Sequence, residues 1–190
     1  MAHEIYTTKG FIIASENKGE SDRILFLFTE SFGLIRASAQ GSRKLESKLR
    51  YALQDFTFGE FSFVRGKHGW RLTSAHALAP SYAVTDYPIK IKTLRLLKKL
   101  SGEDEANELL FSELLAAFSF IDAEGITGED KSVEALLVLK ILSSLGYWGE
   151  EKGDTFVQSP FTKASVDSIT AKRKIIIQEL NKSLRATQLL

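Results

Sequence analysis

The stretch of sequence that decides the fold reads Leu34-Ile35-Arg36-Ala37-Ser38-Ala39-Gln40-Gly41-Ser42-Arg43-Lys44-Leu45-Glu46-Ser47-Lys48-Leu49-Arg50. Apolar and polar residues alternate in its first half, which predicts a β-strand with Arg36 and Ser38 on the face opposite Ile35 and Ala37. The second half begins at Gly41 and carries four cationic side chains. We expect this second half to be a helical insertion between two strands.

Four further segments have the composition of strands and lie at residues 5–15, 24–29, 56–64 and 70–77. Each is rich in apolar, β-branched or aromatic residues and is bounded by turn-forming residues. Gly59 interrupts the alternating phenylalanines of the third of these segments, and we expect a β-bulge there. Residues 65–69 are bracketed by glycines and predict a hairpin turn. Five strands with an insertion after the third match an OB-fold, a small Greek-key barrel, although other small barrels fit the pattern equally well.

From about residue 79 the sequence changes to helical periodicity. Apolar residues recur at helical spacing in residues 87–100, 109–118, 133–145 and 165–184. We therefore predict an α+β protein with two domains. Residues 1–78 form a five-stranded OB-fold barrel, and residues 79–190 form an all-helical C-terminal domain.

Charge is distributed unevenly along a chain that is almost neutral overall. The 190 residues contain 25 Lys and Arg against 24 Asp and Glu. Residues 36–71 nevertheless hold eight basic and three acidic side chains, a net charge of +5, whereas residues 81–190 hold 14 basic and 16 acidic ones, a net charge of −2. This asymmetry predicts that any polyanion binds to the N-terminal part of the chain.

The basic segment, which we define as residues 41–51, supplies the primary candidates for phosphate contacts: Arg43, Lys44, Ser47, Lys48 and Arg50. In a helix, all of these except Arg50 would share one face. Phosphate contacts need many donors and little side-chain selectivity, which such a face provides. A secondary rim comprises Arg36, Arg65, Lys67 and Arg71. The alternative is that the charge run is only a solvated face.

Aromatic side chains form a second part of the expected site. OB-folds bind single-stranded nucleic acid in a groove that combines basic side chains with aromatic stacking surfaces. Phe32, Tyr51 and Trp70 are the candidates for stacking on bases. Packing in the core or at its rim is the commoner role of aromatic residues in a small barrel and is the alternative for each of them.

Catalytic and metal-binding motifs are missing from the sequence. No cysteine is present, which excludes disulfides, thiolate metal sites and cysteine nucleophiles. The histidines, His3, His68 and His76, lack metal-ligand spacing, and no metalloprotease, P-loop or G-x-S-x-G motif occurs. We therefore expect no catalysis, no metal and no cofactor. The sequence also shows no signal peptide and no run of roughly 18 apolar residues, so we expect a cytoplasmic protein.

Three motifs stand out in the N-terminal part: Gly19-Glu20-Ser21-Asp22-Arg23, Thr29-Glu30-Ser31-Phe32-Gly33, and the run from Gly41 through Phe56. They resemble the N-terminal signature of the RecO family of bacterial DNA-repair recombination mediators. The run agrees at every fixed position with the family's pattern G-x-R-[RK]-x-x-S-[RK]-L-R-x-x-L-Q-x-F. Leu145-Gly146-Tyr147 and the segment 180–184 resemble later elements of the family, so the resemblance covers nearly the whole chain.

The resemblance implies a non-enzymatic recombination mediator whose OB-fold binds DNA. It implies binding to single- and double-stranded DNA, strand annealing, and help in loading RecA. The partners that it implies are RecR and the single-stranded-DNA-binding protein, and the localisation is cytoplasmic and nucleoid-associated. A protein-interaction adaptor, in which the helical domain carries the activity and the basic barrel is incidental, is the alternative.

The region after the Leu-Gly-Tyr element departs from the family. Many members carry a four-cysteine zinc module there, whereas this chain has the short loop 150–162 and no cysteine, which excludes that zinc site. We expect apolar packing to close the region instead, and four aromatic residues flank or lie in the loop: Tyr147, Trp148, Phe156 and Phe161.

Overall fold

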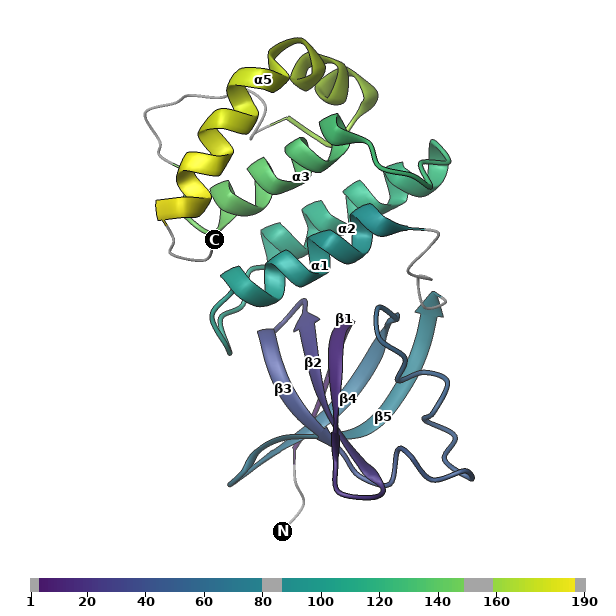
Figure 1. Cartoon of the computed structure of the whole chain (residues 1–190). Helices are drawn as coiled ribbons and strands as arrows, with labels where there is room; N and C mark the ends of the chain where they lie inside the picture. The colour runs from purple at the N-terminus through teal and green to yellow at the C-terminus, as the bar shows by residue number, and fades with distance from the viewer. Residues whose placement is uncertain (1–3, 80–86, 149–158, 187–190) are drawn as a thin grey trace. The chain divides into compact units, whose positions relative to one another are not determined.

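Five strands form the N-terminal part of the chain (Figure 1): β1 (Ile5–Lys18), β2 (Asp22–Thr29), β3 (Gly33–Ala39), β4 (Phe58–Gly66) and β5 (Gly69–Ala79). The structure, a computed structural model, describes residues 4–79, 87–148 and 159–186. The strands make a closed barrel in the order β1-β2-β3-β5-β4.

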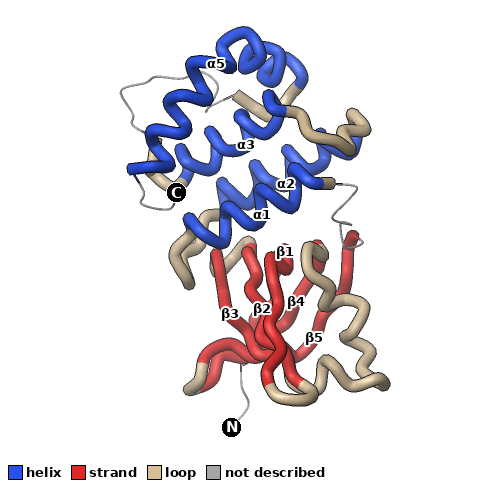
Figure 2. The backbone as a smooth tube through the Cα atoms, viewed as in Figure 1, coloured by secondary structure: helices blue, strands red, loops and turns tan. Residues whose placement is uncertain are grey.

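The barrel closes because the long strand β1 pairs with two different strands. The first half of β1 pairs with β4 and its second half pairs with β2, both antiparallel. β3 pairs in parallel with β5, whereas β2 pairs antiparallel with β3 and β4 with β5. This arrangement is that of an OB-fold. The predicted five-stranded OB-fold barrel is therefore confirmed (Figure 2, strands in red).

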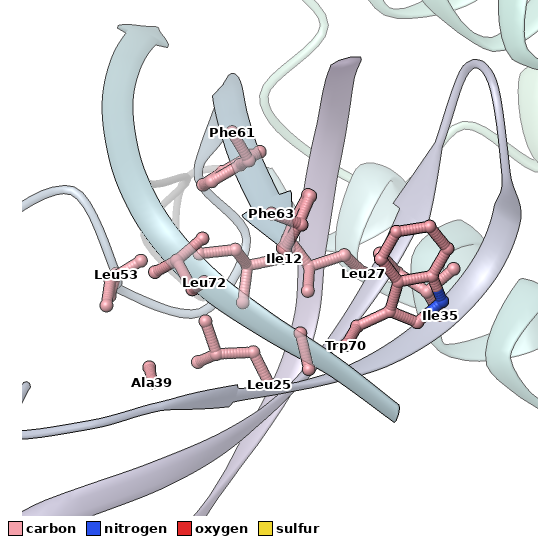
Figure 3. Packing of buried hydrophobic residues seen from close by; sticks show 11 residues of the cluster. Ile12, Leu25, Leu27, Ile35, Ala39, Leu53, Phe61, Phe63, Trp70 and Leu72 are labelled. Atoms are coloured by element: carbon pink, nitrogen blue, oxygen red, sulfur yellow. The ribbon is translucent and has the colours of Figure 1, made fainter. Parts of the chain in front are cut away.

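Inward-facing side chains from all five strands fill the barrel (Figure 3). Phe61 and Phe63 of β4 are completely buried, as the alternating pattern predicts. The register between β4 and β5 shifts next to Gly59, so the expected irregularity is confirmed. A Cβ atom at Gly59 would lie 2.6 Å from the carbonyl oxygen of His76, which explains why this position has no side chain.

The connection between β3 and β4 is not helical, and our prediction of a helical insertion is wrong. Its backbone makes successive turns, in which the N–H groups of Lys44, Ser47 and Arg50 each donate to the carbonyl oxygen three residues earlier. The cause lies in the barrel, because Leu53 is completely buried in the core and the N–H of Arg43 donates to the carbonyl oxygen of Ser21 at 2.9 Å. These contacts hold the connection along the barrel and leave no shared helical face for the basic side chains.

A segment between the first two helices also packs on the barrel. Ser101–Glu108, which we call the strap, belongs to the compact unit that contains the barrel. Glu103 forms a bridge with Leu34 of β3, and the N–H of Asp104 donates to the Leu34 carbonyl oxygen at 2.9 Å. The indole Nε1–H of Trp70 donates to Oδ1 of Asp104 at 2.9 Å. The strap therefore pairs alongside the start of β3 and gives the buried indole its hydrogen-bond partner.

The second compact unit is helical: α1 (Pro88–Leu100), α2 (Glu108–Ala123), α3 (Lys131–Ser144) and α5 (Lys163–Ala186). The apolar stripes read from the sequence are buried, as at Leu114 and Phe118 of α2. Asp130 begins α3 by accepting hydrogen bonds from the N–H groups of Ser132 and Val133. Within the described residues, the C-terminal part is all-helical, as predicted.

Aromatic packing after α3 agrees in part with our expectation. Trp148 and Phe161 are buried, and the ring of Phe161 meets that of Phe120 edge-on at 5.4 Å. Tyr147 is 41% exposed, and Phe156 lies outside the described residues. The expectation of apolar packing is thus confirmed for Trp148 and Phe161.

Candidate nucleic-acid interface

A groove of about 560 Å³ lies on the outside of the barrel. It is lined by the β1–β2 hairpin, by β2 and β3, and by the β4–β5 hairpin. Four cationic side chains are among the lining residues: Lys18, Arg36, Lys67 and Arg71. His68 also lines the groove, and Asp22 is the one carboxylate in the lining.

Strand register explains how these side chains meet. Ser38 of β3 pairs with Ile24 of β2 on one side and with Arg71 of β5 on the other. Ile24 and Val64 are buried and give the groove an apolar floor, whereas Arg71 is exposed. Arg36 and Ser38 point away from the core because alternate residues of a strand face opposite sides. The face predicted for Arg36 and Ser38 is therefore confirmed.

Asp22 links the groove to the basic segment. Its carboxylate accepts a hydrogen bond from the N–H of Gly41 at 2.8 Å and another from the Ser21 hydroxyl at 3.0 Å. The Gly41 N–H is the main reason that the pKa of the Asp22 carboxyl is lowered, and the Ser21 hydroxyl and the charges of Lys18 and Lys44 lower it further. An ionised Asp22 thus holds the turn at which the basic segment leaves β3.

The primary candidates of the basic segment do not line the groove. Arg43, Lys44, Lys48 and Arg50 are exposed, and Ser47 is half-buried. The guanidinium of Arg43 also donates from Nη1 to the carbonyl oxygen of Gly19 at 2.8 Å. The structure therefore brings together three residues of the predicted secondary rim, while the predicted primary residues lie outside the groove lining, along the basic segment that begins beside Asp22.

Arg65 belongs neither to the groove lining nor to the basic segment. Its Nη2 lies 3.1 Å from Oδ2 of Asp104 in the strap, and its guanidinium carbon lies 4.9 Å from the centre of the Trp70 ring. Both partners of the ion pair are about half exposed, so the pair contributes little to stability. Arg65 is nevertheless oriented toward the strap and is absent from the groove lining.

Two of the three candidate stacking residues pack in the barrel. Trp70 is only 6% exposed, and Phe32 is half-buried with its ring 4.9 Å from the Trp70 ring. Tyr6 meets both rings edge-on. Core packing, the alternative given for each candidate, thus describes Phe32 and Trp70, and Trp70 also lines the groove. Tyr51 is 83% exposed and has an accessible ring.

The sequence-based reasoning missed Lys18. This residue lies at the end of β1, directly opposite Asp22 in the β1–β2 pairing. It falls outside the basic stretch 36–71, and only the hairpin brings it to the groove. The signal that would have found it is its place beside the β1–β2 turn, since the corresponding loop of OB-folds contributes to their binding face.

In residues 4–79, 87–148 and 159–186, no three His, Cys, Asp or Glu side chains are placed to hold a metal ion. No helix in that part of the chain combines the length and apolar character needed to cross a membrane.

Known proteins resemble this chain over both of its units. A family model described as "Recombination protein O N terminal" matches residues 1–80. The "DNA repair protein RecO" of Desulfitobacterium hafniense is 41% identical over 154 residues, which cover 75% of this chain and 52% of that protein. The protein of the same name from Clostridium acetobutylicum is 27% identical over 150 residues, covering 75% of this chain and 59% of the relative.

The chain therefore spans little more than half the length of these two relatives. The matched family model and the barrel coincide, since residues 1–80 contain all five strands. The motifs at residues 19–23, 29–33 and 41–56 lie in the same part of the chain. On this agreement of motifs, fold and relatives, the chain belongs to the RecO family.

Proposed function

We propose that this chain is a non-enzymatic recombination mediator of DNA repair that binds DNA in the barrel groove. The observation that carries the proposal is the meeting of Lys18, Arg36, Lys67 and Arg71 in one groove of the OB-fold. OB-folds bind oligonucleotides on the face of strands 2 and 3 and with the loops between strands 1 and 2 and between strands 4 and 5. The groove is lined by the same elements.

The chemistry of the groove suits a sugar-phosphate backbone. Lysine and arginine side chains neutralise phosphates without reading the bases, so binding should be independent of sequence. Lys44 and Lys48 of the basic segment are exposed on the neighbouring surface and would extend the phosphate track beyond the groove. Asp22 holds the first turn of this segment against the groove and thereby fixes the two surfaces relative to each other.

The finer functions rest on the family. The relatives are named DNA repair proteins. We propose that the chain binds single- and double-stranded DNA, anneals complementary strands and assists RecA loading, with RecR and the single-stranded-DNA-binding protein as partners.

Salt dependence of DNA binding tests the proposal. Four neutralised phosphates predict a slope of log affinity against log salt of about −3 to −4. Fluorescence anisotropy of the full chain with unrelated oligonucleotides of equal length measures both the slope and the sequence dependence. A flat salt response, or binding confined to one sequence, would overturn the proposal.

Paired charge removals locate the site. Arg36→Ala with Arg71→Ala removes two groove cations and should reduce the slope by about 1.5. Arg173→Ala with Lys174→Ala is the matched control, because it removes two exposed cations from α5. The groove variant should melt within about 1 °C of the parent, since exposed charges contribute little to folding. Equal losses in the two variants would show that net charge, and not the groove, governs binding.

A further inference from the structure

We infer that Tyr51, assisted by Leu45, is a base-contacting residue that makes this chain prefer single-stranded over duplex DNA. The inference rests on the proposed function and adds to it the form of DNA that is recognised. Neither side chain lines the groove.

The exposure of these two side chains is unusual. Leu45 and Tyr51 are each 83% exposed, whereas the other exposed large hydrophobic residues in the described part of the chain range from 41% to 67%. Single exposed apolar residues need no explanation. Here, however, the two most exposed ones stand in the same 11-residue basic segment as Arg43, Lys44, Lys48 and Arg50.

The segment is held at both ends, so the exposure does not come from a loose loop. At its start, Asp22 accepts from Gly41 N–H and the N–H of Arg43 donates to the Ser21 carbonyl oxygen. Just after its end, Leu53 is completely buried and its carbonyl oxygen accepts from Nη1 of Arg23 at 3.1 Å. Tyr51 therefore precedes a fixed core residue by two positions, and presenting its ring costs little additional ordering on binding.

Charge and apolar surface together define the ligand. Cations fix phosphates, and an aromatic ring stacks on a base with little regard to which base it is. In a duplex the base faces are covered by their neighbours, so the ring gains a partner only on a single strand. If the partner were instead an apolar groove of another protein, binding would bury the cations of the same segment without a counter-charge, which is costly. A single-stranded polynucleotide satisfies both kinds of group.

Three probes with equal numbers of phosphates test the inference on the full chain: a thymidine oligonucleotide of about 16 nucleotides, its abasic analogue, and a duplex with the same phosphate count. Tyr51→Ala should weaken binding to the thymidine strand by about tenfold, because stacking supplies a large part of the affinity for each base. Affinity for the abasic strand and the duplex should stay within about twofold of the parent. Tyr51→Phe keeps the ring and should retain the parent's preference.

Each outcome of these binding measurements either supports or contradicts the role of Tyr51. If Tyr51→Ala binds the thymidine strand like the parent, or loses affinity equally for all three probes, the inference is wrong while the proposed function stands. If the parent binds none of the probes, the proposed function itself fails. Acidic phospholipid vesicles serve as a competitor, because cations beside apolar side chains also suit a lipid surface. Tyr51-dependent binding to vesicles without Tyr51-dependent binding to the thymidine strand would overturn the inference.

Discussion

Replacing Gly33 with alanine tests how the strap is held on the barrel. Gly33 has φ +65, and a Cβ atom there would lie 1.8 Å from the carbonyl oxygen of Glu105. The nearest atoms belong to the strap backbone, so no side-chain rotation relieves the overlap. To reach an ordinary contact, the strap has to move by about 1.5 Å, which is enough to break short hydrogen bonds.

The cost follows from the contacts that this movement breaks. A left-handed alanine costs about 1–2 kcal/mol relative to glycine. The bond from Asp104 N–H to the Leu34 oxygen is worth about 1 kcal/mol, and leaving the indole N–H of Trp70 buried without its acceptor costs about 1–3 kcal/mol. Gly33→Ala should therefore lower the free energy of unfolding by about 3–6 kcal/mol, which would be exceptional for a single methyl group.

Gly19→Ala is the matched control. Gly19 has φ +60, but nothing lies within 4 Å of the added Cβ atom. Its substitution should cost only the backbone term of about 1–2 kcal/mol. Urea unfolding followed by circular dichroism gives both values, and tryptophan emission should shift to the red in Gly33→Ala if the strap leaves Trp70. Equal costs for the two variants, with unchanged emission, would refute the idea that the strap is docked through Gly33 and Asp104.

Three further outcomes are expected. The pKa of the Asp22 carboxyl is lower in the folded protein than the ordinary aspartate value of 3.8, so the ionised carboxylate stabilises the fold at any pH above 3.8. This stabilisation is lost as the pH falls through the lower pKa of the folded protein. The difference in unfolding free energy between the parent and Asp22→Asn should therefore shrink in acid, and a constant difference in urea titrations across that range would contradict this. Trp148→Ala should cost about 3 kcal/mol or more, because that ring is 8% exposed, whereas Tyr147→Ala, at 41% exposed, should cost less than about 1 kcal/mol in the same unfolding assay. The melting temperature should be the same with and without a chelator, since the chain has no cysteine to build a thiolate zinc site, and elemental analysis showing one metal per chain would disprove this.

Local pattern was sufficient for most of the secondary structure. Alternation predicted β3 with Arg36 facing outward, and the glycines around residues 65–69 predicted the β4–β5 hairpin. Helical periodicity predicted α1, α2, α3 and α5 to within a few residues, apart from the later end of α2. These features depend on neighbours in the sequence, because side-chain direction and turn geometry are set within a few residues.

The connection after β3 shows where local pattern fails. Its lysines and arginines are good helix formers, yet the backbone forms single turns because Leu53 is drawn into the barrel core and Arg43 N–H is taken by Ser21. The burial of apolar side chains outweighs the small differences in helix propensity between residues, which amount to a few tenths of a kcal/mol each.

The candidate site was likewise decided in part by tertiary structure. The sequence alone determined that the cations gather in the N-terminal part and that the motifs are those of the RecO family. Only the closed barrel determined that Lys18 joins Arg36 and Arg71, that Trp70 is buried, and that Arg65 turns to Asp104 of the strap. The physical reason is that strand pairing and burial join residues tens of positions apart, and no pattern within a short window records which distant strand becomes a neighbour.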